Sequence, residues 1–140
     1  MTTLIHTFVA MEPRGKERPR FVRATGRVYT PAKTVRAELR IQEQVAAEYR
    51  DAPYLGPVTL VVTVYLPKPK SKPKNKPCWP TSKPDWDNYG KLVSDALNGI
   101  VYRDDSQITW ASVHKAYCTI LHPKPGVMIT VQTIDDEVAA

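Results

Sequence analysis

With 140 residues, the chain is long enough for one ordinary domain and too short for two independent ones, so we expect a single domain spanning 1–140. The 20 Lys and Arg against 14 Asp and Glu give a net charge of +6, which favours a polyanionic partner without identifying it. Cys78 and Cys118 lack a second Cys or His at ligand spacing, which argues against a disulfide framework and a structural zinc site. No segment approaches the roughly 18 uninterrupted apolar residues of a membrane span, so we expect a cytoplasmic protein with no membrane partner.

The first half of the chain predicts two strands with a basic segment and a helix between them. Residues 3–11 are a short β-prone run, and residues 57–66 alternate as a half-buried strand does. The basic segment 12–30 leads into a helix of about five turns, with Thr30 as the expected N-cap and Pro31 as the first helical residue. The side chains expected to recur along its stripe are Val35, Leu39, Gln42, Val45, Ala46 and Tyr49.

The second half begins with a long basic loop. Residues 67–84 contain six Lys and six Pro without periodicity, and so many missing backbone donors exclude a helix interior or a central strand. A second amphipathic helix follows, and Gly99 is well placed to end it. Its apolar stripe is Tyr89, Leu92, Val93, Ala96, Leu97 and Ile100. Residues 107–117 and 127–134 predict two more strands, ahead of a frayed acidic and apolar tail at 135–140.

This order of elements predicts the fold class. It fits an α+β domain, in which two main helices pack on one face of a mixed β-sheet. The order is strand, basic segment, helix, strand, basic loop, helix, strand and strand. We see no internal repeat.

Polar residues concentrate where the basic loop meets the second helix. Asp85 and Asp87 are two residues apart, a spacing that puts both side chains on one side of an extended chain. Lys91, Asp95 and Asn98 then follow at helical spacing, opposite the apolar stripe. We therefore expect a polar line running up the helix from the acidic pair.

A second acidic pair, Asp104 and Asp105, stands just before a predicted strand, and a returning chain would bring one of them beside Asp85 and Asp87. Clustered carboxylates repel one another unless a cation is bound. Oxygen ligands suit Mg²⁺ or Mn²⁺, whereas zinc would call for His or Cys. Such a metal can activate water and neutralise charge that develops on a phosphodiester.

These residues carry a resemblance to a known family. The pattern Asp-x-Asp-Asn-x-x-Lys, then Asp-Ala-Leu and later Asp-Asp before a strand, resembles the signature of the RusA family of Holliday junction resolvases. It runs here as Asp85-Trp86-Asp87-Asn88-Tyr89-Gly90-Lys91, Asp95-Ala96-Leu97 and Asp104-Asp105. The stretch 13–21 and Tyr29-Thr30-Pro31 are similar to phage-type members. The resemblance covers about residues 5–134, with its discriminating part in residues 84–106.

The resemblance implies a homodimer, in a bacterial or phage-infected cell, that binds four-way DNA junctions during recombination and repair. It implies symmetric cleavage that depends on Mg²⁺, which Mn²⁺ could replace. The residues implied as metal-binding and catalytic are Asp85, Asp87 and Asp105, with Lys91 as the essential basic residue of the catalytic site. Some members have a basic residue directly before the first Asp, where this chain has Pro84, and Lys83 could take over its DNA contact.

The basic segment is the second candidate site, through Arg14, Lys16, Arg18, Arg20, Arg23 and Arg27. Beside a nuclease signature, phosphate binding is favoured over a solvated surface hairpin. Trp79 and Phe21 could equally stack on bases or pack internally. The purely structural alternatives are that Asp85 and Asp87 cap a helix and that Lys91 pairs with an aspartate one helical turn away. His6, His114 and His122 are dispersed, and we assign them no role.

Two other functions stay open on the sequence. One is a catalytically inactive protein that binds branched DNA through its basic segments. The other is a metal-dependent phosphohydrolase acting on nucleotides, although the basic excess favours a long polyanion.

Overall fold

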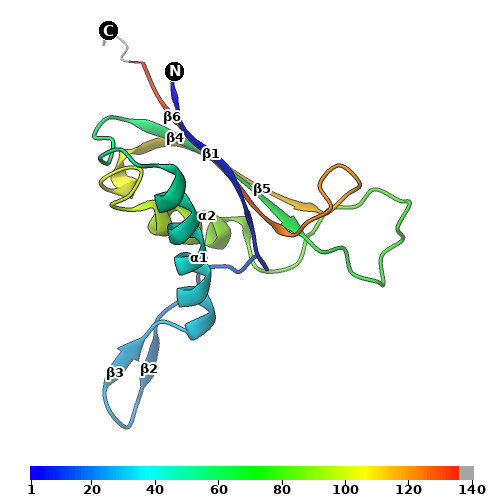
Figure 1. Ribbon diagram of the computed structural model, residues 1–140. Coiled ribbons are helices and arrows are strands. Elements are labelled where there is room, and N and C mark those ends of the chain that lie inside the picture. The colour runs from blue at the N-terminus through cyan, green and yellow to red at the C-terminus, as the bar shows by residue number, and fades with distance from the viewer. Residues whose placement is uncertain (136–140) are drawn as a thin grey trace, which may run out of the picture.

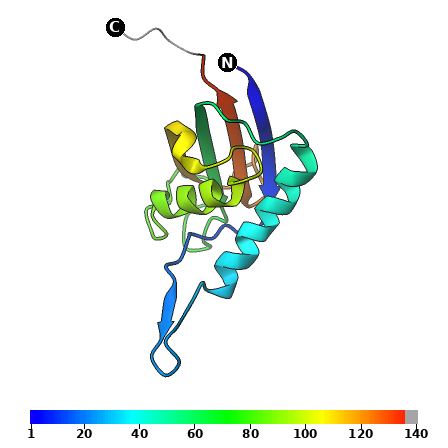
Figure 2. The same cartoon turned by 90° about the vertical axis from the view of Figure 1, so that its left-hand side faces the viewer.

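The structure is a computed structural model that describes residues 1–135 (Figures 1 and 2). The predicted tail, beyond Asp135, lies outside the described residues. The elements in chain order are β1 (Thr3–Ala10), β2 (Arg20–Val22), β3 (Arg27–Tyr29), α1 (Ala32–Glu48), β4 (Val58–Leu66), α2 (Trp86–Leu97), the 3₁₀ helix η1 (Asp105–Gln107), β5 (Ile108–Tyr117) and β6 (Gly126–Thr133).

The main sheet has the strand order β1-β6-β4-β5. Strand β5 runs parallel to β4, while β6 is antiparallel to both β1 and β4, so the sheet is mixed. Both helices lie on the same face of it (Figures 1 and 2). The predicted α+β class and its arrangement are therefore confirmed.

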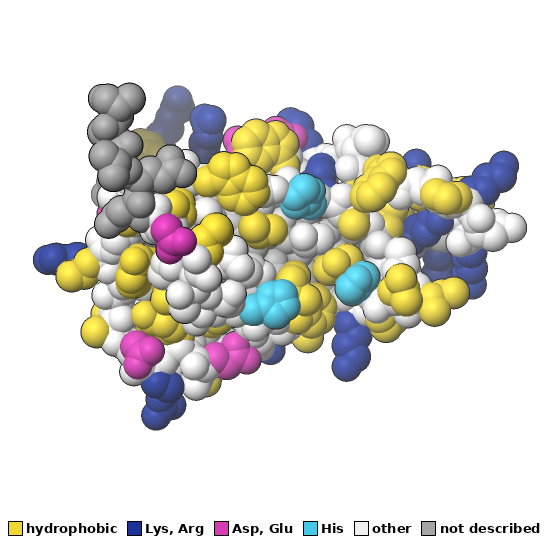
Figure 3. Space-filling view, turned by 90° about the horizontal axis from the view of Figure 1, so that it is seen from above, with side chains coloured by type: hydrophobic (Ala, Val, Ile, Leu, Met, Phe, Trp, Pro, Cys, Tyr) yellow, Lys and Arg dark blue, Asp and Glu magenta, His cyan; other side chains and the backbone are white. Residues whose placement is uncertain are grey.

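The core forms between this face and the helices. Alternate residues of β4, among them Leu60, Val62 and Val64, are buried there. The opposite face of the sheet, seen in Figure 3, has the histidines and apolar side chains in its middle and the Lys and Arg side chains around its margin. The middle of that face therefore carries little positive charge.

The buried face of α1 differs from the prediction. The helix buries Thr34, Ala37, Ile41 and Val45. Val35 and Leu39, expected on the stripe, are 41% and 47% exposed. Two overlapping rows at helical spacing were available, and the row with Ala37 and Ile41 joins the core, where α1 contacts both α2 and β1. The helix also begins at Ala32 with Pro31 at the N-cap position, so the predicted cap at Thr30 is wrong.

The second half of the chain agrees closely with the prediction. Helix α2 buries Tyr89, Leu92, Val93, Ala96 and Leu97. Gly99 follows the helix with φ of +77°, a conformation that favours glycine, and Ile100 lies beyond the helix end. The loop 67–84 contains no helix or strand. No described helix combines the length and the apolar character needed to cross a membrane.

The basic segment contains a hairpin whose strands the sequence did not define. Strands β2 and β3 pair with each other and form a separate two-stranded sheet. The hairpin projects from the body of the domain as an arm (Figures 1 and 2). Phe21 and Val28 face one another across it and are both exposed.

Candidate functional site

The first acidic pair lies at the N-terminus of α2, and its side chains make no capping hydrogen bond. Asp85 occupies the N-cap position in an extended conformation, but its side chain makes no capping hydrogen bond. Asp87 lies in the first turn, where the positive end of the helix dipole favours a carboxylate. Both are exposed, and within residues 1–135 neither carboxylate takes part in a hydrogen bond or an ion pair. The two groups are thus available to an external ligand.

Lys115 of β5 holds the chain just before this pair. Its Nζ donates to the carbonyl oxygens of Ser82 at 2.9 Å and of Pro84 at 3.0 Å. Sequence reasoning missed this residue. The available signal was a lysine on the row of β5 that includes Val113, which faces α2. A charged group on a helix-facing row needs polar partners, and here the loop carbonyls supply them.

Beyond the acidic pair, a chain of ion pairs joins the middle of α2 to the basic segment and to α1. Lys91 Nζ lies 3.3 Å from Asp95 Oδ1, and Lys16 Nζ lies 3.5 Å from Asp95 Oδ2. Lys16 also pairs with Glu38 of α1. The side chain of Lys91 is 60% exposed, so its ammonium stays accessible to a ligand. Asn98, expected at the end of this polar line, is instead the C-cap residue of α2.

Lys16 is the interior member of that chain, with 23% of its side chain exposed. Burial by itself would lower the pKa of Lys16, but the hydrogen bond and charge of Glu38, together with Asp95, outweigh it and raise the pKa. Its backbone N–H donates to Asn88 O at 2.9 Å. Lys16 therefore joins the basic segment to both helices, and the DNA contact expected of it stays a prediction.

The basic segment passes close to the start of α2. A side chain at Gly15 would place its Cβ 2.8 Å from Pro84 Cβ, so only glycine allows this approach. A cavity of about 370 Å³ lies beside the contact, with Arg18, Asp87 and Lys91 among its lining residues. A carboxylate, a lysine and an arginine thus face the same depression.

The second acidic pair is divided between two roles. Asp104 Oδ2 accepts a hydrogen bond from Ser106 N at 3.0 Å, and Gln107 Oε1 accepts one from Asp104 N at 2.9 Å. The hydrogen bonds from Ser106 lower the pKa of Asp104. Gln107 Nε2 in turn donates to Tyr54 O at 2.7 Å. Asp104 therefore caps η1, whereas the Asp105 carboxylate makes no hydrogen bond or ion pair within residues 1–135.

Tyr102 fastens this turn to the helix. It is buried, and its hydroxyl donates to Ser94 O at 2.7 Å. Burial raises the pKa of Tyr102, and the charges of Asp105, Asp95 and Asp104 raise it further. The hydroxyl therefore stays protonated and serves as a hydrogen-bond donor.

The structure does not bring the three predicted metal ligands together. Asp105 precedes Ile108 at the start of β5, whereas the chain before Asp85 is tied to Lys115 near the strand's end. Among residues 1–135, no three His, Cys, Asp or Glu side chains lie close enough to hold a metal ion. Mg²⁺ commonly uses one or two carboxylates and completes its shell with water and phosphate oxygens. Asp85 and Asp87 fit that arrangement.

The remaining basic residues differ in how free their charges are. Arg14 pairs with Glu12 and Arg20 with Glu17, each at 3.1 Å. The candidates that are exposed and form no ion pair within residues 1–135 are Arg18, Arg23, Arg27 and Lys83. Two of these, Arg23 and Arg27, lie on the hairpin arm.

A basic α+β domain with unengaged carboxylates at a helix N-terminus fits a protein that brings a divalent cation to a polyanion. Residues 10–132 match the family described as Endodeoxyribonuclease RusA, so the chain belongs to the RusA family. The chain is also similar to "Uncharacterized protein YqaN" of Bacillus subtilis (strain 168), with 40% identity over 130 residues that cover 84% of this chain and 89% of that protein. The resemblance drawn from the acidic pattern is confirmed, and the family implies an endodeoxyribonuclease that binds DNA junctions.

Proposed function

We propose that this protein is a magnesium-dependent endodeoxyribonuclease that resolves Holliday junctions by paired, symmetric nicks in recombination and repair. One observation carries the proposal. In a chain of the RusA family, Asp85 and Asp87 stand at a helix N-terminus, exposed and without any structural hydrogen bond. Exposed carboxylates without a hydrogen-bond or ion-pair partner in residues 1–135 are free to serve a ligand.

Asp85 and Asp87 would hold Mg²⁺, for which Mn²⁺ could substitute. The bound ion would supply activation of water and neutralisation of charge on the phosphodiester. Lys91 shares a cavity with Asp87, and its exposed ammonium would bind the scissile phosphate or the departing oxygen as a point charge. Asp95 orients that ammonium from one helical turn away. The third predicted ligand, Asp105, stays a prediction.

Phosphates of the junction arms would be bound by the cations that form no ion pair within residues 1–135, which are Arg18, Arg23, Arg27 and Lys83. Arg14 and Arg20 would contribute less, because each already has a carboxylate partner.

We also propose a homodimer. A four-way junction offers two opposed cutting points, and a two-fold symmetric protein presents two matching sites.

The test is to incubate the protein with a labelled four-way junction and a matched linear duplex, with and without Mg²⁺. Asp85→Asn is the active-site variant, and Asp51→Asn, which alters an exposed aspartate outside α2 and η1, is the matched control. Symmetric, Mg²⁺-dependent nicks in the junction alone, lost only in Asp85→Asn, are the expected result. Junction binding without cleavage would identify an inactive binding protein. Turnover of free nucleotides, assayed in parallel, would identify a phosphohydrolase.

A further inference from the structure

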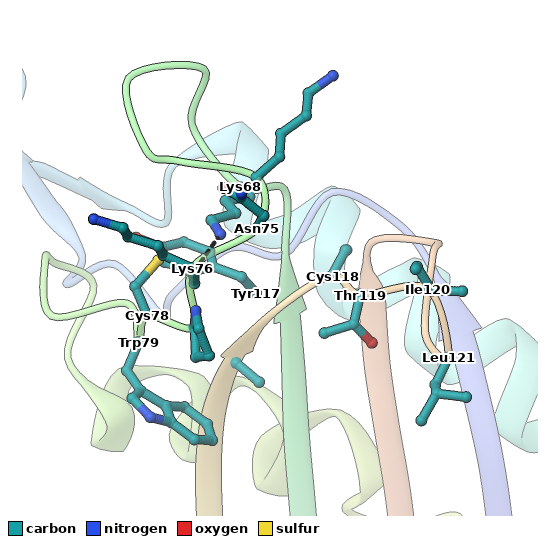
Figure 4. Close-up of a pocket in the computed structure, with 13 residues that line it drawn as sticks. Lys68, Asn75, Lys76, Cys78, Trp79, Tyr117, Cys118, Thr119, Ile120 and Leu121 are labelled. Atoms are coloured by element: carbon teal, nitrogen blue, oxygen red, sulfur yellow. Dashed lines mark hydrogen bonds between the residues drawn. The ribbon is translucent and has the colours of Figure 1, made fainter.

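A groove of about 500 Å³ lies at the end of the sheet, between the loop 67–84 and the chain that follows β5 (Figure 4). The end of β5 and the residue after it, Cys118, line the groove between two apolar walls. Trp79 stands on one side and Ile120 with Leu121 on the other, as Figure 4 shows. These side chains are 70%, 98% and 86% exposed, so the groove displays apolar surface to solvent.

The groove is also strongly basic. Lys68, Lys74 and Lys76 line it, and no Asp or Glu does. Lys68 Nζ donates to Lys76 O at 2.8 Å, which ties the two arms of the loop together. The ammonium groups of Lys74 and Lys76 form no ion pair within residues 1–135, and both residues are exposed. An occupant must therefore supply negative charge as well as flat or apolar groups.

The groove lies close to the acidic pair along the chain. Ala116, which lines it, is adjacent to Lys115, whose ammonium contacts the carbonyl oxygen of Pro84, directly before Asp85. The loop 67–84 itself begins at the groove and ends at the acidic pair. A polymer engaged near Asp85 could therefore extend along the loop into the groove.

We propose that this groove binds single-stranded or unpaired DNA, with a base stacked on Trp79 and phosphates facing Lys74 and Lys76. Lysines combined with exposed aromatic faces, without carboxylates, suit an unpaired strand because every base has a face to stack. A continuous duplex keeps its base faces stacked inside, and would leave Trp79 without that contact. The proposal deepens the proposed function by assigning a place to an unpaired segment of the branched substrate.

The test measures fluorescence anisotropy of a labelled short oligothymidylate, in EDTA so that no cleavage occurs, with wild-type protein, Trp79→Ala and Trp110→Ala. Trp110 is the matched control, because it is 55% exposed but lies near the start of β5, outside the groove. We expect Trp79→Ala to weaken the affinity by about tenfold, as the loss of one stacked base does, and Trp110→Ala to leave it unchanged. Trp79→Phe, which keeps an aromatic face, should retain most of the affinity.

Equal affinities of wild type and Trp79→Ala would overturn the proposal, as would a wild-type protein that binds an acidic peptide in the groove but no oligothymidylate. Thermal unfolding of each variant checks that the fold is intact. Failure of the proposed function is distinguishable, because it leaves Trp79-dependent binding in EDTA but no nicks with Mg²⁺. Nicks with Mg²⁺ together with Trp79-independent binding would overturn only the groove.

Discussion

The two acidic pairs of this chain look alike in sequence and differ in structure. At the start of α2, Asp85 and Asp87 form no hydrogen bond or ion pair within residues 1–135. At η1, Asp104 accepts from Ser106 N and closes a capping box with Gln107. A carboxylate at a helix start is therefore explained by capping only where the capping hydrogen bond exists. The difference separates two carboxylates that have no partner in residues 1–135 from one that caps a turn of the fold.

The largest effect should come from neutralising either carboxylate of the first acidic pair. Asp85→Asn or Asp87→Asn should reduce cleavage of a four-way junction by at least about 100-fold, because each removes a charged metal ligand. The melting temperature should change little, because removing one of two neighbouring negative charges relieves their repulsion, while the loss of Asp87 also removes a favourable interaction with the helix dipole. Rates of nicking at saturating Mg²⁺ and thermal unfolding of the same samples provide the measurement. Full activity in both variants would refute the site.

A substitution at Lys115 tests whether Asp85 and Asp87 depend on the hydrogen bonds that hold the chain before them. Lys115→Met removes the donor to the Ser82 and Pro84 carbonyls and should lower the nicking rate by about 10- to 100-fold, as the loss of an orienting partner does. The Mg²⁺ concentration for half-maximal activity should rise, while junction affinity in EDTA stays the same. Lys115→Arg should restore part of the rate. An unaltered Mg²⁺ dependence in Lys115→Met would show that the hydrogen bonds from Lys115 to the loop are dispensable.

Lys16 links both helices to the basic segment, so its loss should appear in stability. Lys16→Met leaves Glu38 and Asp95 without their shared partner and should cost about 1–3 kcal/mol in the free energy of unfolding. The folded-state pKa of Lys16 is raised, so its contribution is fully present below the usual value of 10.5 and is lost as pH rises through the folded value. Denaturant unfolding from pH 7 to pH 11 measures this. Wild-type stability that falls no more steeply than that of Lys16→Met would contradict it.

The smallest effect should be at Asp104, on the other side of the comparison. Its folded-state pKa is lowered, so its contribution is present above the usual value of 3.8 and is lost as pH falls through the folded value. Asp104→Asn should melt slightly below the wild type at pH 7, and the gap should close in acid. Nicking by this variant should stay within about twofold of wild type, because surface substitutions away from a site have small effects. A large loss of nicking would place Asp104 in the site.

Helix α2 and its flanks were predictable from the sequence because their signals are local. The apolar stripe from Tyr89 to Leu97 matches the buried residues of the helix, and Gly99 adopts the positive φ that its position at the helix end favours. The family was identifiable for the same reason, since its pattern is a short run of chemically specific residues around Asp85. Proline content similarly excluded regular structure from 67–84.

By itself, then, the sequence determined the family, the α+β class, the acidic pair at α2 and the basic loop, because each depends on residue type and short-range spacing. Tertiary structure decided which face of α1 is buried, the partial burial of Lys16 and the hydrogen bond from Lys115 to the carbonyl oxygen of Pro84. It also decided that Asp105 lies just before the start of β5, whereas Lys115 lies near the strand's end. Each of these depends on which segments meet across the sheet. Such contacts are set by the packing of the whole domain, and no local pattern encodes them.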